Sequence, residues 1–230
     1  MPTVLITGAS RGIGLEFARQ YAADGWQVLA CARAPAKAQE LQQLVAGSGG
    51  QAALCPLDVD DDASLAALQR QLAGRPIDVL INNAGVIGNR GAALGSMDYP
   101  AFARALATNV VGPVRVSDGL LANLEAGQQK KLITITSRMG SLQLAQSNAM
   151  IYRASKAAVN MAMRCLSLDL VAKGVIVALL HPGWVKTDMG GQAADLTPGA
   201  SVAALRHVIA NLTPADNGRF INHDGTPIPW

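Results

Sequence analysis

Thr3-Val-Leu-Ile-Thr-Gly-Ala-Ser-Arg-Gly-Ile-Gly14 is the stretch that decides the fold. Its apolar first half predicts a buried strand, and Ile13, Phe17 and Tyr21 then recur at helical spacing. Between the two lies a turn whose glycines, spaced G-x-x-x-G-x-G, are Gly8, Gly12 and Gly14. Bare backbone at such a turn lets a pyrophosphate approach the positive N-terminal end of a helix. A glycine-rich turn that binds nothing is the alternative.

The rest of the chain repeats this alternation of a short apolar run and an amphipathic stretch. We expect further strands at 27–32, 51–57, 77–81, 131–136, 175–180 and 219–221. We expect helices at 35–45, after an N-cap at Asp62, at 99–124, from about 152 to 172 and at 200–211. The pattern predicts one α/β domain over residues 1–230, a doubly wound Rossmann-type parallel sheet of about seven strands with helices on both faces.

Composition and charge narrow the classes of function. Half of the 230 residues are hydrophobic, 15% are charged, the net charge is +3, and no basic run exceeds two residues, so neither nucleic acid nor a membrane is expected as a partner. No apolar run approaches ~18 residues, and no basic region precedes the first one, so neither a membrane span nor a signal peptide is expected. Cys31, Cys55 and Cys165 lack metal-ligand spacing and are interpreted as small core residues. We expect a cytoplasmic protein without a metal site.

Short motifs of polar residues or glycine follow four of the predicted strands. They are Asp58-Val59, Asn83-Ala-Gly85, Ser137 and Pro182-Gly183. Ligands of open α/β sheets bind outside the carboxyl ends of the strands, so these motifs predict one site at that edge.

A tyrosine and a lysine four residues apart follow the fifth strand, in Tyr152-Arg-Ala-Ser-Lys156. On a helix they lie on one face, one turn apart. A nearby ammonium favours the phenolate, so we expect Lys156 to lower the pKa of Tyr152 and to make it a general acid or base near neutral pH. Alone, this spacing arises often by chance and is more typical of an ordinary helix surface.

Taken together and in order, these motifs resemble the short-chain dehydrogenase/reductase family over essentially the whole chain. Ser-Arg-Met-Gly-Ser141, Asp-Met-Gly-Gly191 and the ending Gly-Thr-Pro-Ile-Pro-Trp230 resemble its C-factor and sniffer-type carbonyl reductase branch. Ser137 precedes Tyr152 by 15 residues, slightly more than is usual in the family, so we expect an extended loop between them.

The resemblance implies roles for individual residues. Tyr152 would exchange the proton of the substrate oxygen, Ser137 would hydrogen-bond that oxygen, Lys156 would hold the nicotinamide ribose, and Asn109 would hold a water that connects Lys156 to solvent. The catalytic group is then Asn109, Ser137, Tyr152 and Lys156. The implied cofactor-binding residues are Gly8, Ser10, Arg11, Gly12, Ile13, Gly14, Arg33, Asp58, Val59, Asn83, Ala84, Gly85, Tyr152, Lys156, Pro182, Gly183, Val185 and Thr187.

The second predicted strand indicates which dinucleotide is preferred. In proteins that bind NAD(H), an Asp or Glu about 20 residues after the glycine turn hydrogen-bonds the ribose 2′-hydroxyl. Here the strand ends in Ala32-Arg33, and no acidic residue follows before Glu40. Arg33, with Arg11, offers planar donors for a 2′-phosphate, which predicts NADP(H). Both arginines could instead be solvated surface residues.

The loops after the fifth and sixth strands should line the substrate pocket. They supply Met139, Leu142, Leu144, Trp184 and Met189 and few charges, so a mainly apolar carbonyl or alcohol substrate is expected, although these side chains could simply pack the loops. The scatter of His181, His207 and His223 fits neither a metal site nor a triad, so no role is assigned to them.

The function expected is an NADPH-dependent oxidoreductase of the carbonyl reductase type. A dinucleotide-binding regulatory or signalling protein without physiological turnover is the alternative, against which an intact Ser137, Tyr152 and Lys156 argue. A sugar-nucleotide epimerase or dehydratase is a weaker third, because the region after Leu180 is short for a nucleotide-sugar substrate.

Two helices carry further expectations. The Tyr152 helix is apolar nearly all round, which predicts burial on more than one side and favours a homodimer. In the helix at 99–124, Pro113 has no N–H for the carbonyl of Asn109 four residues earlier. We therefore expect a bend or an early helix end there, and a carbonyl free to bind water.

Overall fold

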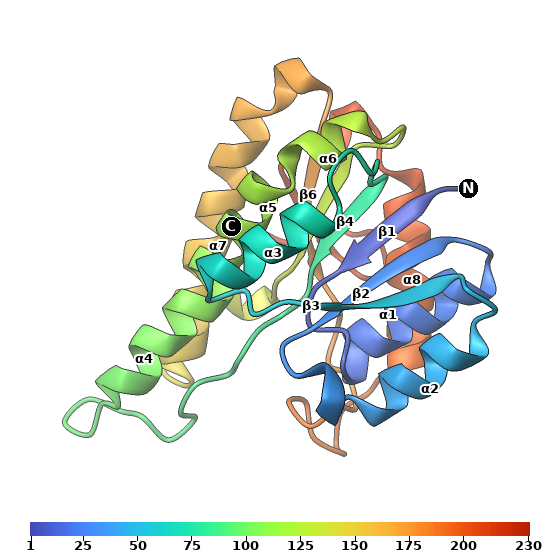
Figure 1. Ribbon diagram of the computed structural model, residues 1–230. Helices are drawn as coiled ribbons and strands as arrows, with labels where there is room; N and C mark the ends of the chain where they lie inside the picture. Colours follow the sequence, from blue (N-terminus) through green and yellow to red (C-terminus); the bar gives the residue numbers. More distant parts are fainter.

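Seven strands form one sheet in the order β3-β2-β1-β4-β5-β6-β7 in the computed structural model, which describes residues 1–230 (Figure 1). The strands are β1 Thr3–Ile6, β2 Gln27–Ala32, β3 Ala52–Pro56, β4 Val79–Asn82, β5 Lys131–Ile135, β6 Ile176–His181 and β7 Arg219–Asn222. All six neighbouring pairs are parallel. The prediction of a doubly wound parallel sheet of about seven strands is confirmed, and each strand boundary lies within two residues of the predicted one.

Helices cover both faces of the sheet. One face carries α1 (Gly12–Ala23), α2 (Gln39–Gly47) and α8 (Pro198–Asn211), and the other α3 (Asp62–Gln71), α4 (Tyr99–Leu106), α5 (Gly112–Gly119), α6 (Leu121–Ala126) and α7 (Met150–Asp169) (Figure 1). Successive strand residues point to opposite faces, so Val4 and Ile6 belong to one core while Leu5 belongs to the other. Because both faces are covered, the strands are continuous apolar runs.

The N-cap of α3 is Asp61, so the expectation of Asp62 is wrong by one residue. The Asp61 carboxylate accepts from the backbone N–H of Ala63 at 2.9 Å. Asp62 pairs instead with Arg115 of α5.

The helix expected at 99–124 is interrupted, which corrects the prediction of one continuous helix. Between α4 and α5, residues Ala107–Val111 form the π-helical segment η2, in which Gly112 donates to the carbonyl of Ala107, five residues back. Pro113 follows directly, and a second break at Leu120 separates α5 from α6. The bend expected at Gly112-Pro113 therefore takes the form of a π-turn that contains Asn109, a feature common at functional sites.

Short 3₁₀ segments modify two other predicted helices. The second helix begins with η1 (Pro35–Lys37), and α7 ends at Asp169 before η4 (Val171–Lys173).

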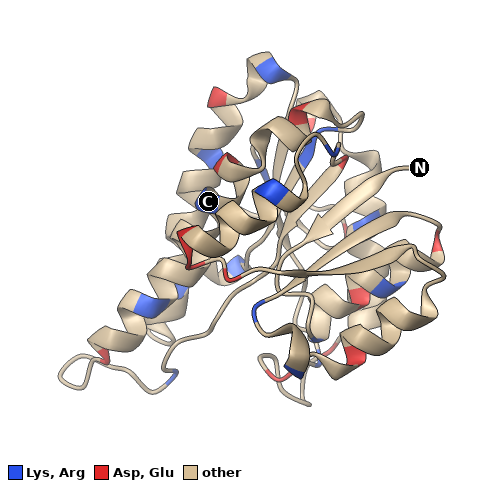
Figure 2. Cartoon of the chain, viewed as in Figure 1, with Lys and Arg blue, Asp and Glu red and all other residues tan.

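Residues of both charges are interspersed along the helices and loops (Figure 2). No helix is long and apolar enough to cross a membrane. Cys31 and Cys55 are buried neighbours on β2 and β3, as expected of core residues, but Cys165 is exposed on α7, which corrects its assignment to the core.

Candidate active site

Hydrogen bonds join the residues after β1 to the residues after β4, and these contacts shape the glycine turn. The Thr7 hydroxyl oxygen accepts from the backbone N–H groups of Asn83 and Ala84, both at 3.0 Å. In return, the Asn83 side-chain amide donates to the carbonyls of Thr7 and Gly8 at 3.0 and 3.1 Å. The Asn83 side chain is thus engaged in holding the turn in shape.

The glycines of the turn stand where side chains do not fit. A Cβ on Gly8, whose φ is +66°, would lie 2.8 Å from the Ala84 Cα. A Cβ on Gly14 would collide with the Gly8 carbonyl oxygen, and Gly12 has a φ of +57°. The result is bare backbone at the N-terminal end of α1, with Ser10, Arg11 and Ile13 between the glycines.

Arg11 lies within this turn, and Arg33 comes directly after β2, the strand beside β1. Arg33 follows β2 and is exposed, with no ion pair or side-chain hydrogen bond. Arg11 forms an exposed ion pair with Asp188 at 3.1 Å, so it is held toward the loop after β6. Exposed pairs of this kind are weak, so a ligand anion can compete for Arg11.

Asp58 and Val59 lie at the end of β3, but their contacts are structural. Val59 is buried against α5, where a Cβ on Gly112 would lie 2.9 Å from its side chain. The half-buried carboxylate of Asp58 accepts from the backbone N–H of Asp60 at 3.1 Å.

Asn109, in the π-turn, joins the loop after β4 to α7. Its side chain accepts from the Val86 N–H and donates to the Val86 carbonyl, each at 2.8 Å, and it also donates to the Ser155 hydroxyl at 2.9 Å. Ser155 in turn donates to the carbonyl of Tyr152 at 2.8 Å. Asn109 and Ser155 are fully buried, so this chain of hydrogen bonds fixes α7 against the loop.

Lys156 is buried without an acidic partner. Its ammonium nitrogen donates to the Ile135 carbonyl at 3.0 Å, at the end of β5. A Cβ on Gly85 would lie 3.8 Å from the same nitrogen, so the loop after β4 passes directly beside it. Burial lowers the pKa of Lys156 to about 8.

Tyr152 lies one turn before Lys156 on the same face of α7, with the Lys156 nitrogen 5.7 Å from the centre of its ring. Burial raises the pKa of Tyr152 to about 12, against lowering effects of the Ser137 hydroxyl and of the Arg90 charge. The expectation that Lys156 brings this pKa toward neutrality is therefore not met by these groups alone. At pH 7 the tyrosine is a protonated phenol.

The segment after β6 closes the cofactor side of the site. Pro182 and Val185 are buried, and Val185 forms a bridge with Leu196. A Cβ on Gly12 would lie 3.3 Å from the Thr187 methyl group, so this segment touches the glycine turn. Arg90, from the loop after β4, donates to the carbonyl of Met189 across the same region.

The loop between Ser137 and Tyr152 contains the 3₁₀ segment η3 (Arg138–Gly140), followed by turns up to the start of α7. Arg153 of α7 holds it, donating to the carbonyl and side-chain oxygens of Asn148 at 3.0 Å and to the Leu144 carbonyl at 3.3 Å. Gln143 also donates to the carbonyl of Trp230, so the C-terminal segment supports the same loop.

A cavity of about 510 Å³ lies between the loops after β5, β6 and β7, and Arg138, the neighbour of Ser137 in the sequence, is part of its wall. Leu144 and Trp184 line it, as expected. Leu142 is largely exposed and Met139 and Met189 are not part of its wall, so those three assignments are corrected. Polar residues also line this cavity: Arg138, His181, Asp195, Asn222, His223 and Thr226.

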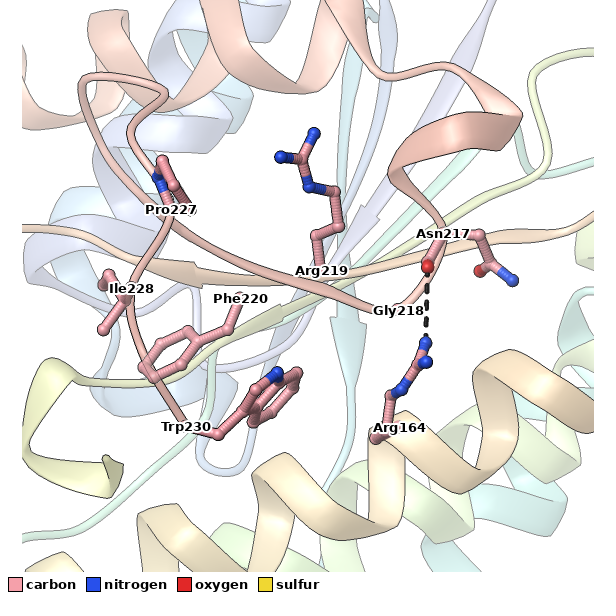
Figure 3. Close-up of a pocket in the computed structure, with 8 residues that line it drawn as sticks. All are labelled: Arg164, Asn217, Gly218, Arg219, Phe220, Pro227, Ile228 and Trp230. Carbon is pink, nitrogen blue, oxygen red and sulfur yellow. Dashed lines mark hydrogen bonds between the residues drawn. The ribbon is translucent and has the colours of Figure 1, made fainter. Parts of the chain in front are cut away.

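A smaller cavity, of about 220 Å³, lies beneath the C-terminal segment and contains none of the predicted site residues. Figure 3 shows its wall, where the rings of Phe220 and Trp230 lie 5.6 Å apart and Arg164 of α7 donates to the Asn217 carbonyl at 3.5 Å. Pro227 and Ile228 line both cavities. This segment therefore forms a partition between them.

Sequence reasoning missed three residues that shape the site. The sequence could have identified Ser155, because its position between Tyr152 and Lys156 puts a hydroxyl on the same helix face. The sequence could not have identified Arg153 and Arg90, because their hydrogen-bond partners come from loops whose course it does not predict.

Comparisons with known proteins agree with this geometry. The family model of short chain dehydrogenases matches residues 2–196. C-signal of Myxococcus xanthus is 48% identical over 156 residues, which cover 67% of this chain and 93% of that protein. Among solved structures, the carbonyl reductase Sniffer of D. melanogaster has a TM-score of 0.91 and 30% identity and covers 100% of both chains. The NADPH-bound carbonyl reductase from chicken fatty liver has a TM-score of 0.88 and 34% identity and covers 100% of this chain and 99% of that one.

Proposed function

The chain belongs to the short-chain dehydrogenase family, in its C-factor and sniffer-type branch, and we propose that it works as an NADPH-dependent carbonyl reductase. It would transfer a hydride between the nicotinamide and the carbonyl or alcohol carbon of a mainly apolar substrate. The observation that carries this proposal is the convergence of Ser137, Tyr152 and Lys156 at the carboxyl edge of the sheet, beside the bare glycine turn.

The residues at this edge fit a dinucleotide. The glycine turn leaves space and free N–H groups for a pyrophosphate at the start of α1, and Arg33 has no other partner. The loop at Gly85 and the segment Pro182–Thr187 would flank the nicotinamide half, with Lys156 holding the ribose. The relative from chicken fatty liver was solved with NADPH bound. When bound, NADPH supplies the hydride.

Tyr152 would supply the proton. Its raised pKa keeps the phenol protonated at pH 7, the form that can donate to a carbonyl oxygen as negative charge develops there. The Ser137 hydroxyl would donate a hydrogen bond to the same oxygen. Lys156, partly charged near its pKa of about 8, would stabilise the tyrosinate left after transfer, and Asn109 would hold the water that returns the proton.

The test is consumption of NADPH against a panel of apolar aldehydes, ketones and quinones. Tyr152→Phe should lower kcat about 10²- to 10⁴-fold, the range of general acid catalysis, while NADPH affinity remains within about threefold. Tyr99→Phe, on the exposed start of α4, is the matched control and should change nothing. Full activity of Tyr152→Phe, or no turnover with any of these compounds, would contradict the proposal.

A signalling role without turnover has the similarity to C-signal in its favour. The environment of Lys156 favours catalysis. A buried ammonium with no acid beside it is unfavourable for the fold. It could hold the ribose in either case, but the tyrosine and the serine beside it are groups that binding of the dinucleotide alone does not need.

A further inference from the structure

The wall of the cavity of about 510 Å³ includes a histidine whose ring carries a buried nitrogen that no protein group satisfies. His181, the last residue of β6, is only 8% exposed, and its Nδ1 atom has no hydrogen-bond partner. Its neighbour in β7, by strand register, is Asn222, which lines the same cavity. Leaving a buried ring nitrogen unpaired is costly, so the arrangement indicates a partner that enters from the cavity.

A free guanidinium lies on the same cavity. Arg138 directly follows Ser137, and its side chain has neither an acid within salt-bridge distance nor a hydrogen bond to the protein. Arginine presents a planar fork of donors that matches a carboxylate bidentately. An arginine that is left free next to the residue that holds the substrate oxygen is placed to bind another part of the same substrate.

The surroundings of His181 are electropositive. Besides burial, the charges of Arg138, His223 and Lys156 lower its pKa to about 4, so the ring is neutral at pH 7. His223 is oriented by Asn222, whose Oδ1 lies 2.9 Å from its Nδ1. The single acid on the cavity wall, Asp195, is exposed and does not pair with Arg138. An entering anion would meet mainly positive or hydrogen-bonding groups.

We propose that this cavity binds a carboxylate on the carbonyl substrate, with Arg138 as its main partner and His181 as a hydrogen-bond donor. The inference rests on the proposed carbonyl reductase function and names its substrate class: a carbonyl compound with an apolar body and an acidic end. The apolar body would pack on Leu144 and Trp184, which line the same cavity.

The test compares 4-oxo-4-phenylbutanoate with its methyl ester, since the two share the reacting ketone and differ in the carboxylate. The wild type should have at least a tenfold higher kcat/KM for the acid. Arg138→Gln should lower kcat/KM for the acid at least tenfold and leave the ester within twofold. Asp195→Asn, the matched control, removes a negative charge from the cavity wall and should raise kcat/KM for the acid. Equal values for acid and ester in the wild type, or an equal loss of both in Arg138→Gln, would overturn the proposal.

His181→Leu separates a binding role from a structural one. It removes the unpaired nitrogen, so the melting temperature should hold or rise while the KM for the acid increases about threefold or more. A lower melting temperature with an unchanged KM for the acid would assign His181 to the fold alone.

Calorimetric titration of the acid into the protein, with and without NADP⁺, separates the subsite from the reaction. If neither compound is reduced, binding of the acid that Arg138→Gln abolishes supports the subsite, and the reductase function is then decided by the panel of aldehydes, ketones and quinones alone. Absence of acid binding to the wild type, whether or not ketones are reduced, refutes the subsite.

Discussion

The ammonium nitrogen of Lys156 lies 5.7 Å from the centre of the Tyr152 ring, one turn along α7. Burial acts on the two groups in opposite senses, lowering the pKa of Lys156 to about 8 and raising that of Tyr152 to about 12. Both shifts favour the uncharged forms. The protonated phenol is the form of Tyr152 that the proposed donation of a proton to a carbonyl oxygen needs.

Lys156→Met should stabilise the fold at pH 7 while abolishing turnover. In the unfolded chain the lysine has a pKa near 10.5, and the lowered folded value means that its charge disfavours folding below pH 8. Removing it should raise the free energy of unfolding by about 1–3 kcal/mol, after allowance for the lost bond to Ile135. Urea unfolding at pH 7 measures this difference.

The difference in stability between Lys156→Met and the wild type should also depend on pH. Between pH 8 and about 10.5 the unfolded state binds more protons at this position than the folded state, so the wild type gains stability as pH rises. The gap between Lys156→Met and the wild type should therefore narrow from pH 7 to pH 10. Lys173→Met, a more exposed lysine paired with Glu125, is the control and should show little of this trend. A gap that stays constant over this pH range would contradict burial of the Lys156 charge as the cause.

The sequence predicted the sheet well because its strands are buried on both faces and are therefore continuous apolar runs. The local sequence pattern predicted the wrong residue where several neighbouring residues could play the same role and tertiary contacts decided which one does. Asp60, Asp61 and Asp62 can each cap α3, but Asp60 accepts from Thr108 and Asp62 pairs with Arg115, which leaves Asp61 for the cap. Thr108 and Arg115 are both distant in the sequence, so the local pattern could not foresee the outcome.

The candidate site shows the same division. The spacing of Tyr152 and Lys156 predicted that they lie one turn apart on the same helix face, as the structure has them, while their roles stay predictions. The placement of His181 and His223 on one cavity wall could not be predicted, since they are far apart in the sequence and come together only because β7 pairs with β6. The π-turn at Asn109 was foreseen only as an irregularity, because a missing donor at Pro113 predicts a bend but not its form.

Arg33→Asp should reverse or erase the preference for NADPH. Arg33 has no protein partner, so its guanidinium is free for a 2′-phosphate, and a carboxylate there would repel the phosphate and accept from a 2′-hydroxyl. The wild type should bind NADPH about 10- to 100-fold more tightly than NADH, the scale of one or two charge-assisted hydrogen bonds. Fluorescence titration with both cofactors measures this, and Lys37→Asp, on η1, is the control. Equal wild-type affinities would refute the assignment.

We propose that the protein is a homodimer that pairs through α7. Helix α7 lies at the outer side of the molecule in Figure 1. Met161 and Leu168 on α7 and Val111 in the adjoining η2 are about half exposed or more. Light scattering at micromolar concentration should give twice 23.8 kDa for the wild type and the monomer mass for Met161→Glu. Ala46→Glu, exposed on α2 over the other face of the sheet, should remain dimeric. A monomeric wild type would rule the proposal out.

Pro113→Ala should slow turnover without weakening NADPH binding. The π-turn Ala107–Val111 ends immediately before Gly112-Pro113, and the side chain of Asn109 within it is already engaged with Val86 and Ser155. Any water held by Asn109 must therefore use its backbone carbonyl, which an N–H at position 113 would compete for. We expect kcat to fall while NADPH affinity stays within about twofold, because no cofactor contact changes. Pro113→Gly, which adds the same N–H and more flexibility, should act in the same direction, whereas Pro100→Ala, at the start of α4, should leave kcat unchanged. Unchanged kcat in Pro113→Ala, or an equal loss in Pro100→Ala, would show that the proline only shapes the helix.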